Sequence, residues 1–458
     1  MGFLDRDHSV AGPGFSRWLV PPAALAIHLS IGQAYAFSVF KNPLLALKDA
    51  AGQTWSLKEI GYIFSIAIAV LGLSAALFGR WLERAGPRKA MFVSACCFSG
   101  GFLVGSVGVT MHSLALIYLG YGVIGGTGLG LGYISPVSTL IKWFPDRPGL
   151  ATGLAIMGFG GGAMIGGPLG TNLMRFYTAQ GHAGAAAIQY AWITMAVLYF
   201  IFMMFGVFTV RVPGEGWKPE GWAGPAKASA LISTHNVEVN TAFRTPQFWL
   251  LWVVLCMNVT AGIGILEQAS PMIQDLFKGH VTAVAATGFV GLLSLFNMGG
   301  RFFWASVSDF IGRKNTYFIF FSLGAVLYFL LPWTEVNQWN SLPLFVAITC
   351  VLLTMYGGGF ATIPAYLKDL FGSYNVSAIH GRLLTAWSVA GIVGPLIVNG
   401  ILDHYIANHW PRQDAYKVIL HIMTGLLVVG FIANLLVRAV NEKYWMKDQP
   451  KGVAVAGH

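Results

Sequence analysis

The chain has 458 residues, of which 55% are hydrophobic and 10% are charged, whereas about a quarter of the residues in soluble domains are charged. It carries 28 Lys and Arg against 18 Asp and Glu, a formal net charge of +10. This composition excludes an ordinary soluble domain and predicts an all-α polytopic membrane protein surrounded by the lipid bilayer.

Apolar stretches of about 20 residues, long enough to cross a bilayer as helices, recur along the whole chain. Residues 1–17 precede the first stretch as a short polar tail with no expected fold, and residues 439–458 form a second tail. The first stretch is too long for a cleavable signal peptide and follows a mixed-charge segment, so we expect it to be retained. We predict twelve transmembrane helices, at residues 18–40, 57–80, 90–110, 113–142, 149–175, 189–210, 247–273, 282–307, 315–333, 342–368, 381–402 and 416–438.

The basic residues are distributed unevenly across these predicted spans. With a cytoplasmic amino terminus, most of the 28 Lys and Arg fall on the cytoplasmic side, as the positive-inside rule requires. We therefore expect a multi-pass protein of the plasma membrane (the cell inner membrane) with both termini cytoplasmic. The basic excess then needs no nucleic acid partner.

The first predicted span carries polar side chains at membrane depth. His28 could carry a proton, because an unperturbed imidazole titrates at about pH 6.5; the alternative is a hydrogen bond between helices. Lys41, near the outer end, could attract anions by its charge or be an ordinary interfacial lysine.

A tight charged turn, GRWLERAGPRK (79–89), follows the second span, and SDFIGRK (308–314) repeats it in the second half of the chain. Asp309 corresponds to Glu83 and Gly312 to Gly86, both at an offset of 226 residues. Gly-Pro and Phe pairs recur at nearly the same spacing, which indicates an internal duplication of six helices plus six. We expect the two turns to act in conformational change through Gly79, Glu83, Arg84, Gly86, Arg88, Asp309, Gly312, Arg313 and Lys314.

The duplication divides the chain into an N-terminal bundle at 18–210 and a C-terminal bundle at 247–438. Residues 211–246 between them are the longest polar segment and are rich in Pro and Gly. Such a composition is typical of a linker, and we expect it to be cytoplasmic. No third domain is predicted.

Arg301 lies in the middle of the predicted span 282–307. A cation at this depth costs about 2.5–3.5 kcal/mol on insertion scales, so it marks a functional site by default. No carboxylate stands three or four residues away on the same helix, and the duplicated position in the first half is Ala75, so the fold does not require the charge. We predict that Arg301 binds a carboxylate through its planar fork of donors; the alternative is an ion pair with another helix.

Other polar residues are candidates to line the same site. Asn297 lies one turn before Arg301 and could donate its amide to the second carboxylate oxygen. Glu267 is the one acid well inside a predicted span and could exchange a proton, or could lie in a hydrated outer mouth. The phenols of Tyr35, Tyr133 and Tyr356 could hydrogen-bond a small anion, while Trp387 is expected to wall the site.

Metal, cofactor and enzyme chemistry find no support in the sequence. Four cysteines, Cys96, Cys97, Cys256 and Cys350, lie inside predicted spans without metal-ligand spacing. Glycine-rich runs such as 120–133 follow no predicted strand, so they indicate close helix packing rather than phosphate binding. We expect no metal, no cofactor and no enzymatic activity.

The motifs together resemble the major facilitator superfamily, and specifically its oxalate/formate antiporter family, which is related to the monocarboxylate transporters. The resemblance rests on SIGQAYAFSVF in the first span, GRWLERAGPRK, FFWASVSDFIGRK after Arg301, and GRLLTAWSVAGIVGP (381–395). It implies two pseudo-symmetric six-helix bundles around a central site, and a monomer. In these families an arginine at the position of Arg301 binds the substrate carboxylate.

Two departures from those families bear on the substrate. Trp387 stands where oxalate/formate exchangers have a second cation, a lysine, which disfavours a dianion. Asn297 stands where animal monocarboxylate carriers have an aspartate that takes part in proton coupling. We therefore expect a secondary transporter of small monocarboxylates of the lactate, formate or pyruvate type, by proton symport or anion exchange. An oxalate/formate-type dicarboxylate antiporter is the alternative, and a non-transporting carboxylate sensor a remote one.

Overall fold

The computed structural model describes residues 2–214, 216–222, 231–233 and 235–447. Within these ranges the protein is helical, with three isolated β-bridges and no strand. The elements that cross the long dimension of the molecule are α1 (Val20–Ile31) with α2 (Ser38–Leu45), α3 (Leu57–Ala85), α4 (Pro87–Thr110), α5 (Leu114–Ile117) with α6 (Gly126–Trp143), α7 (Pro148–Ala179), α8 (Ala185–Thr209), α10 (Pro246–Leu276), α11 (Ala283–Ile311), α12 (Arg313–Leu330), α13 (Leu342–Phe371), α14 (Val376–Leu383) with α15 (Thr385–Ala407), and α16 (Arg412–Leu436).

Most of these helices have the length and apolarity of membrane spans. Ten satisfy both criteria in the described residues, and the bent pair Arg17–Ala36 and Ser38–Leu45 supplies an eleventh. The helix that carries Arg301, α11, is 29 residues long, or about 43 Å at 1.5 Å per residue. It completes the twelve spans that the sequence predicts.

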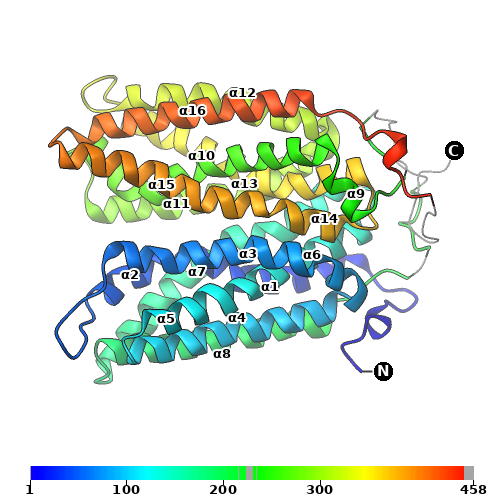
Figure 1. Ribbon diagram of the computed structural model, residues 1–458, viewed down its shortest axis with the longest axis horizontal. Coiled ribbons are helices and arrows are strands. Elements are labelled where there is room, and N and C mark those ends of the chain that lie inside the picture. The colour runs from blue at the N-terminus through cyan, green and yellow to red at the C-terminus, as the bar shows by residue number, and fades with distance from the viewer. Residues whose placement is uncertain (1, 215, 223–230, 234, 448–458) are drawn as a thin grey trace.

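The helices form two bundles (Figure 1). Helices α1 to α8 pack with one another, and α10 to α16 do the same. The bundles meet where α3 packs on α14 and α15 and where α7 packs on α11 and α13. The first and last described segments of the chain lie at the same end of the molecule, which we call the terminal face.

Three of the predicted spans are interrupted. The first span bends by 42° between Arg17–Ala36 and Ser38–Leu45, after a 3-10 stretch at Gly32–Ala36. There a side chain on Gly32 would meet the backbone of Phe159. The fourth span contains a π-helical stretch, Tyr118–Gly125, and the eleventh breaks at Leu384, between α14 and α15. Such breaks are common at functional positions of transporters.

The N-terminal tail is ordered by its contacts with the first bundle. A short 3-10 helix spans Arg6–Ser9, and the Arg88 guanidinium donates hydrogen bonds to the carbonyls of Phe3 and His8, each at 3.0 Å. Further along, Arg17 forms an ion pair with Asp146 at 2.6 Å. The tail is therefore fastened to the terminal face of the first bundle.

The two halves repeat a contact that closes each bundle. Arg88 donates to the carbonyl of Val210 at 3.3 Å, just beyond the end of α8. Its counterpart Lys314 donates to the carbonyls of Leu435 and Val437 at 2.8 and 2.7 Å, at the end of α16. Cations satisfy the unpaired carbonyls that a helix leaves at its C-terminus, and here they fix the last helix of each half.

Candidate functional site

Arg301 is fully buried, at 0% exposed, at the interface between the bundles. Its Nε donates to Oδ1 of Asn297 at 3.1 Å, and its Nη1 donates across the interface to the carbonyl of Ile156 at 3.4 Å. Gly160 leaves room for the guanidinium, since a Cβ there would lie 3.0 Å from Nε. Among the described residues, no carboxylate forms an ion pair with Arg301.

Aromatic rings from both bundles surround the guanidinium. The Phe159 ring of α7 and the Phe360 ring of α13 lie 5.7 and 5.1 Å from its central carbon, within the range of cation–π attraction. Trp387 of α15 packs on both rings, at centroid distances of 5.4 and 4.5 Å, and lies 5.3 Å from the ring of Tyr133. The charge is thus screened from lipid by rings rather than by an anion.

Several donors in this centre lack a partner. Nη2 of Arg301, Oη of Tyr133 and Nε1 of Trp387 are buried and make no hydrogen bond with any residue the structure describes. The phenols of Tyr133 and Tyr35 nevertheless lie close enough to Arg301 to interact with the guanidinium electrostatically and through their hydroxyl groups, although the Tyr133 contact is too long or too bent for a well-formed hydrogen bond. Because an unsatisfied buried polar group costs about 1–3 kcal/mol, such a cluster favours a ligand that accepts hydrogen bonds and carries negative charge.

The structure brings most of the predicted site residues together. Tyr35 and Tyr356 meet across the interface, with their hydroxyl oxygens 3.3 Å apart. Trp387 packs against aromatic rings from both bundles at this centre. The side-chain oxygen of Asn297 accepts a hydrogen bond from Nε of Arg301, and donation by its amide nitrogen to a carboxylate stays a prediction.

His28 shows the hydrogen bond between helices that was its alternative interpretation. Its Nε2 lies 3.1 Å from the carbonyl oxygen of Tyr133, and its ring packs on that of Tyr133 at 5.2 Å. Its other ring nitrogen, Nδ1, is buried and has no partner in the described structure. His28 therefore retains one atom that can accept a proton.

The remaining two candidates are Lys41 and Glu267. Lys41 lies on α2, half-buried, and forms no hydrogen bond or ion pair with the described residues. Glu267 lies on α10, but its side chain falls outside the described part of the structure.

Sequence reasoning missed Phe159, Phe360, His380 and the carbonyl of Ile156. The two phenylalanines carry no chemical signal that separates them from other apolar residues in their spans. His380 precedes the predicted span 381–402 by one residue and was left outside it, whereas α14 begins at Val376 and buries it. Its ring lies 5.9 Å from that of Tyr133.

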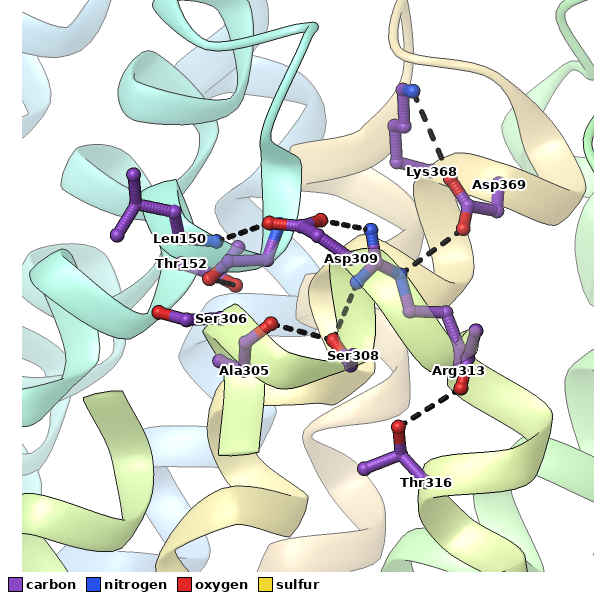
Figure 2. Close-up of polar contacts among 12 residues, drawn as sticks. Leu150, Thr152, Ala305, Ser306, Ser308, Asp309, Arg313, Thr316, Lys368 and Asp369 are labelled. Carbon is purple, nitrogen blue, oxygen red and sulfur yellow. Dashed lines mark hydrogen bonds and ion pairs between the residues drawn. The ribbon is translucent and has the colours of Figure 1, made fainter. Parts of the chain in front are cut away.

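The two charged turns close the terminal face by capping helices of the opposite bundle. The Asp309 carboxylate at the end of α11 accepts hydrogen bonds from the amides of Gly149 and Leu150, at the start of α7, both at 2.8 Å (Figure 2). Glu83 at the end of α3 accepts one from the amide of Ser377, at the start of α14, at 3.1 Å. Negative charge is favourable at a helix N-terminus, so each acid holds the other bundle by its backbone.

Around this closure the turns differ in detail. Arg313 pairs with Asp309 at 2.6 Å and with Asp369 at 3.1 Å (Figure 2), whereas Glu83 pairs with Lys142 at 2.9 Å. Arg84 is exposed and forms no hydrogen bond or ion pair with the described residues. Gly86 and Gly312 both have φ of +86°, a conformation that favours glycine, so each turn requires its glycine for geometry.

Comparison with known proteins agrees with this architecture. The family model described as Major Facilitator Superfamily matches residues 14–395 and again 290–452. The oxalate:formate antiporter of Oxalobacter formigenes is 28% identical over 96% of this chain and 96% of its own length, which confirms the resemblance noted from the motifs. Apicoplast pyruvate carrier 1 of Toxoplasma gondii is 24% identical over 71% of this chain and 66% of its own.

A solved structure supports the same fold. The fucose:proton symporter FucP of E. coli superposes with a TM-score of 0.66 at 11% sequence identity, covering 92% of this chain and 97% of that one. The helical architecture, the two bundles and the family match lead to one assignment. The chain belongs to the Major Facilitator Superfamily and is a membrane transporter rather than an enzyme.

Proposed function

We propose that this transporter is a secondary carrier of small monocarboxylates of the lactate, formate or pyruvate type, and that Arg301 binds the cargo carboxylate. The observation that carries the proposal is the free Nη2 of Arg301 beside the unpartnered Tyr133 Oη and Trp387 Nε1. A carboxylate accepts hydrogen bonds at both oxygens and supplies one negative charge. It would satisfy these donors and neutralise the guanidinium together.

The single cation favours a monoanion over a dianion. In the described centre Arg301 is surrounded by uncharged rings, and Trp387 occupies the position at which the resemblance implies a lysine. The relatives' names include both possibilities, since one is an oxalate:formate antiporter and another a pyruvate carrier. A dicarboxylate antiporter of the oxalate/formate type is accordingly the second candidate.

We further propose that the central site is reached from the face opposite the terminal face. Asp309 and Glu83 hold the terminal face closed, so access must alternate by opening of that closure. With both termini cytoplasmic in a plasma membrane, this arrangement is the outward-facing or occluded state of a monomeric carrier. Residues 18–210 and 247–438 are the two moving bundles, joined by 211–246.

Coupling to protons or to a second anion is a separate part of the proposal. His28 has a free ring nitrogen near Arg301 and is a candidate proton carrier, and Glu267 is the other. Lys41 would act as a charge that attracts anions to the open side. None of these roles is needed for binding at Arg301.

The test is flux in proteoliposomes with labelled lactate, pyruvate, formate and oxalate, with and without a pH gradient. Losing a buried charge partner costs about 2–5 kcal/mol, so Arg301→Ala and Arg301→Lys should reduce uptake by at least about 30-fold while the protein still inserts. Arg244→Ala, an exposed arginine of the linker 211–246, serves as the matched control and should transport normally. Normal uptake by Arg301→Ala would overturn the proposal, and binding without any flux would favour a sensor.

A further inference from the structure

Two histidines flank Tyr133 from opposite bundles. His28 of α1 and His380 of α14 are 0% and 1% exposed, and their rings lie 5.2 and 5.9 Å from the Tyr133 ring. The two imidazoles are close enough to interact electrostatically with each other, and His28 interacts with Arg301 as well. They therefore stand beside the cargo site and on both sides of the interface that must open.

Each histidine has a buried ring nitrogen without a partner in the described structure. His28 Nε2 bonds the carbonyl oxygen of Tyr133; because a carbonyl can only accept, Nε2 carries the hydrogen and Nδ1 presents a free lone pair. Nε2 of His380 is likewise unpartnered. These two nitrogens, on either side of one phenol, are the positions at which the pair can take up a proton.

Charge links these rings to Arg301. A proton on either imidazole would place a second positive charge near the guanidinium, which is unfavourable in a buried site. A carboxylate bound to Arg301 removes that repulsion, so the anion and the proton favour each other's binding. Repulsion between the two rings also limits the pair to one proton at a time.

The other ionisable groups nearby leave this argument intact. Those beside the pair are Tyr133 and Arg301, and the phenols of Tyr35 and Tyr356 interact in turn with Arg301 and Tyr133. The acids on the elements that pack around α14 already have basic partners, namely Glu83 with Lys142, Asp369 with Arg313, and Glu238 with Arg80.

We propose that His28 and His380 are the proton-binding pair of this carrier and hold one proton between them whenever a carboxylate occupies Arg301. This inference rests on the proposed function. The proton comes from solution on the open side, adds to a free ring nitrogen, and returns to solution on the other side with the anion. The occupied centre, with one anion and one proton added, then has the same net charge as the empty one.

The experiment uses full-length protein, labelled pyruvate as probe, and three variants: His28→Gln, His380→Gln and the double variant. His404→Gln, an exposed histidine of α15, is the control. Two readouts are needed. The first is pyruvate uptake driven by a lower pH outside the vesicles than inside, and the second is exchange of labelled for unlabelled pyruvate at the same pH on both sides. Proton uptake on adding pyruvate to purified protein, followed with a pH indicator, gives a third.

We expect the wild type and His404→Gln to take up about one proton per bound pyruvate. The double variant should take up none and lose acid-driven uptake by at least tenfold, with exchange within about threefold of wild type. Unchanged proton uptake in the double variant, or its loss in Glu267→Gln instead, would overturn the inference while leaving Arg301 as the cargo site. Absence of pyruvate binding and exchange in the wild type would instead count against the proposed function. If the double variant fails to fold, the single variants test the inference, which requires acid-driven uptake to fall relative to exchange in both of them.

Discussion

Oδ1 of Asp309 lies 2.8 Å from the amide nitrogen of Gly149 in the opposite bundle. The carboxylate caps α7 although it belongs to α11, so the contact exists only while the terminal face is closed. Glu83 and Ser377 make the corresponding contact between α3 and α14. Closure is thus held at two pseudo-symmetric points.

Removing the charge of Asp309 should loosen this closure. A negative charge at a helix N-terminus contributes about 0.3–1 kcal/mol, so Asp309→Asn should shift the closed-to-open ratio by roughly two- to fivefold. Spin labels at Arg84 and at Phe310, which is 85% exposed, report the separation of the bundles. We expect a second, longer distance in Asp309→Asn and none in the control Asp403→Asn; an unchanged distribution would argue against the capping role.

Close packing of the bundles at Gly79 should be equally necessary. A Cβ at Gly79 would lie 2.8 Å from Cα of Ala378 in the other bundle, whereas one at Gly61 on the same helix meets nothing within 4 Å. Gly79→Val should therefore separate the terminal face and reduce transport at least tenfold, while Gly61→Val should not. The same spin-label pair and exchange of labelled pyruvate measure both effects, and equal behaviour of the two variants would contradict the packing argument.

Exchanging the amide at position 297 for an acid should create a pH dependence. Oδ1 of Asn297 accepts from Nε of Arg301, so the carboxylate of Asn297→Asp would neutralise the guanidinium in place of the cargo. Pyruvate binding should then require protonation of the new acid, and exchange should be weak at neutral pH and rise as pH falls. Exchange measured between pH 5 and 8 checks this prediction. A pH profile parallel to that of wild type would mean that the new carboxylate and the cargo do not compete for Arg301.

A second cation should change the preferred charge of the cargo. Trp387 packs against Tyr133, Phe159 and Phe360 around Arg301, so Trp387→Lys places an ammonium at the wall of the site. We expect the ratio of oxalate to pyruvate flux to rise at least tenfold, because the dianion pairs with both cations. Trp387→Met, which removes the indole without adding charge, controls for the loss of the ring and should leave the ratio low.

Much of the fold followed from apolar length and from the repeated turns. Every membrane-spanning helix needs an apolar stretch of sufficient length, and each half of the duplication repeats the same charged turn. Both patterns can be recognised in the sequence alone. The breaks at Gly32–Ala36 and at Leu384 could not, because they arise where one helix meets the backbone or rings of another. The order in residues 2–17 was also missed, since it depends on Arg88 and Asp146 far along the chain.

For the site, a lone charge in an apolar span was a sufficient signal for Arg301. Its surroundings were harder to foresee, because Phe159 and Phe360 differ from other core phenylalanines only by position. Its four-residue spacing from Arg301 placed Asn297 on the same helical face. Which Asn297 atom bonds the guanidinium depends on the side-chain conformation of Arg301, which the sequence does not show. His380 required knowing that α14 begins five residues before the predicted span.

The contacts of Asp309 and Glu83 also determine which genetic changes this carrier can tolerate. Both acids accept hydrogen bonds from main-chain N–H groups, which every residue except proline possesses. Leu150 and Ser377 can therefore be replaced by many other amino acids without loss of these hydrogen bonds. Inserting or deleting one residue before α7 or α14 would instead move the gripped amide out of reach. Gly149 is the exception, because a Cβ there would lie 2.0 Å from the carbonyl oxygen of Ala305. Elsewhere at these two helix starts, evolution should be free in residue identity and strict in spacing.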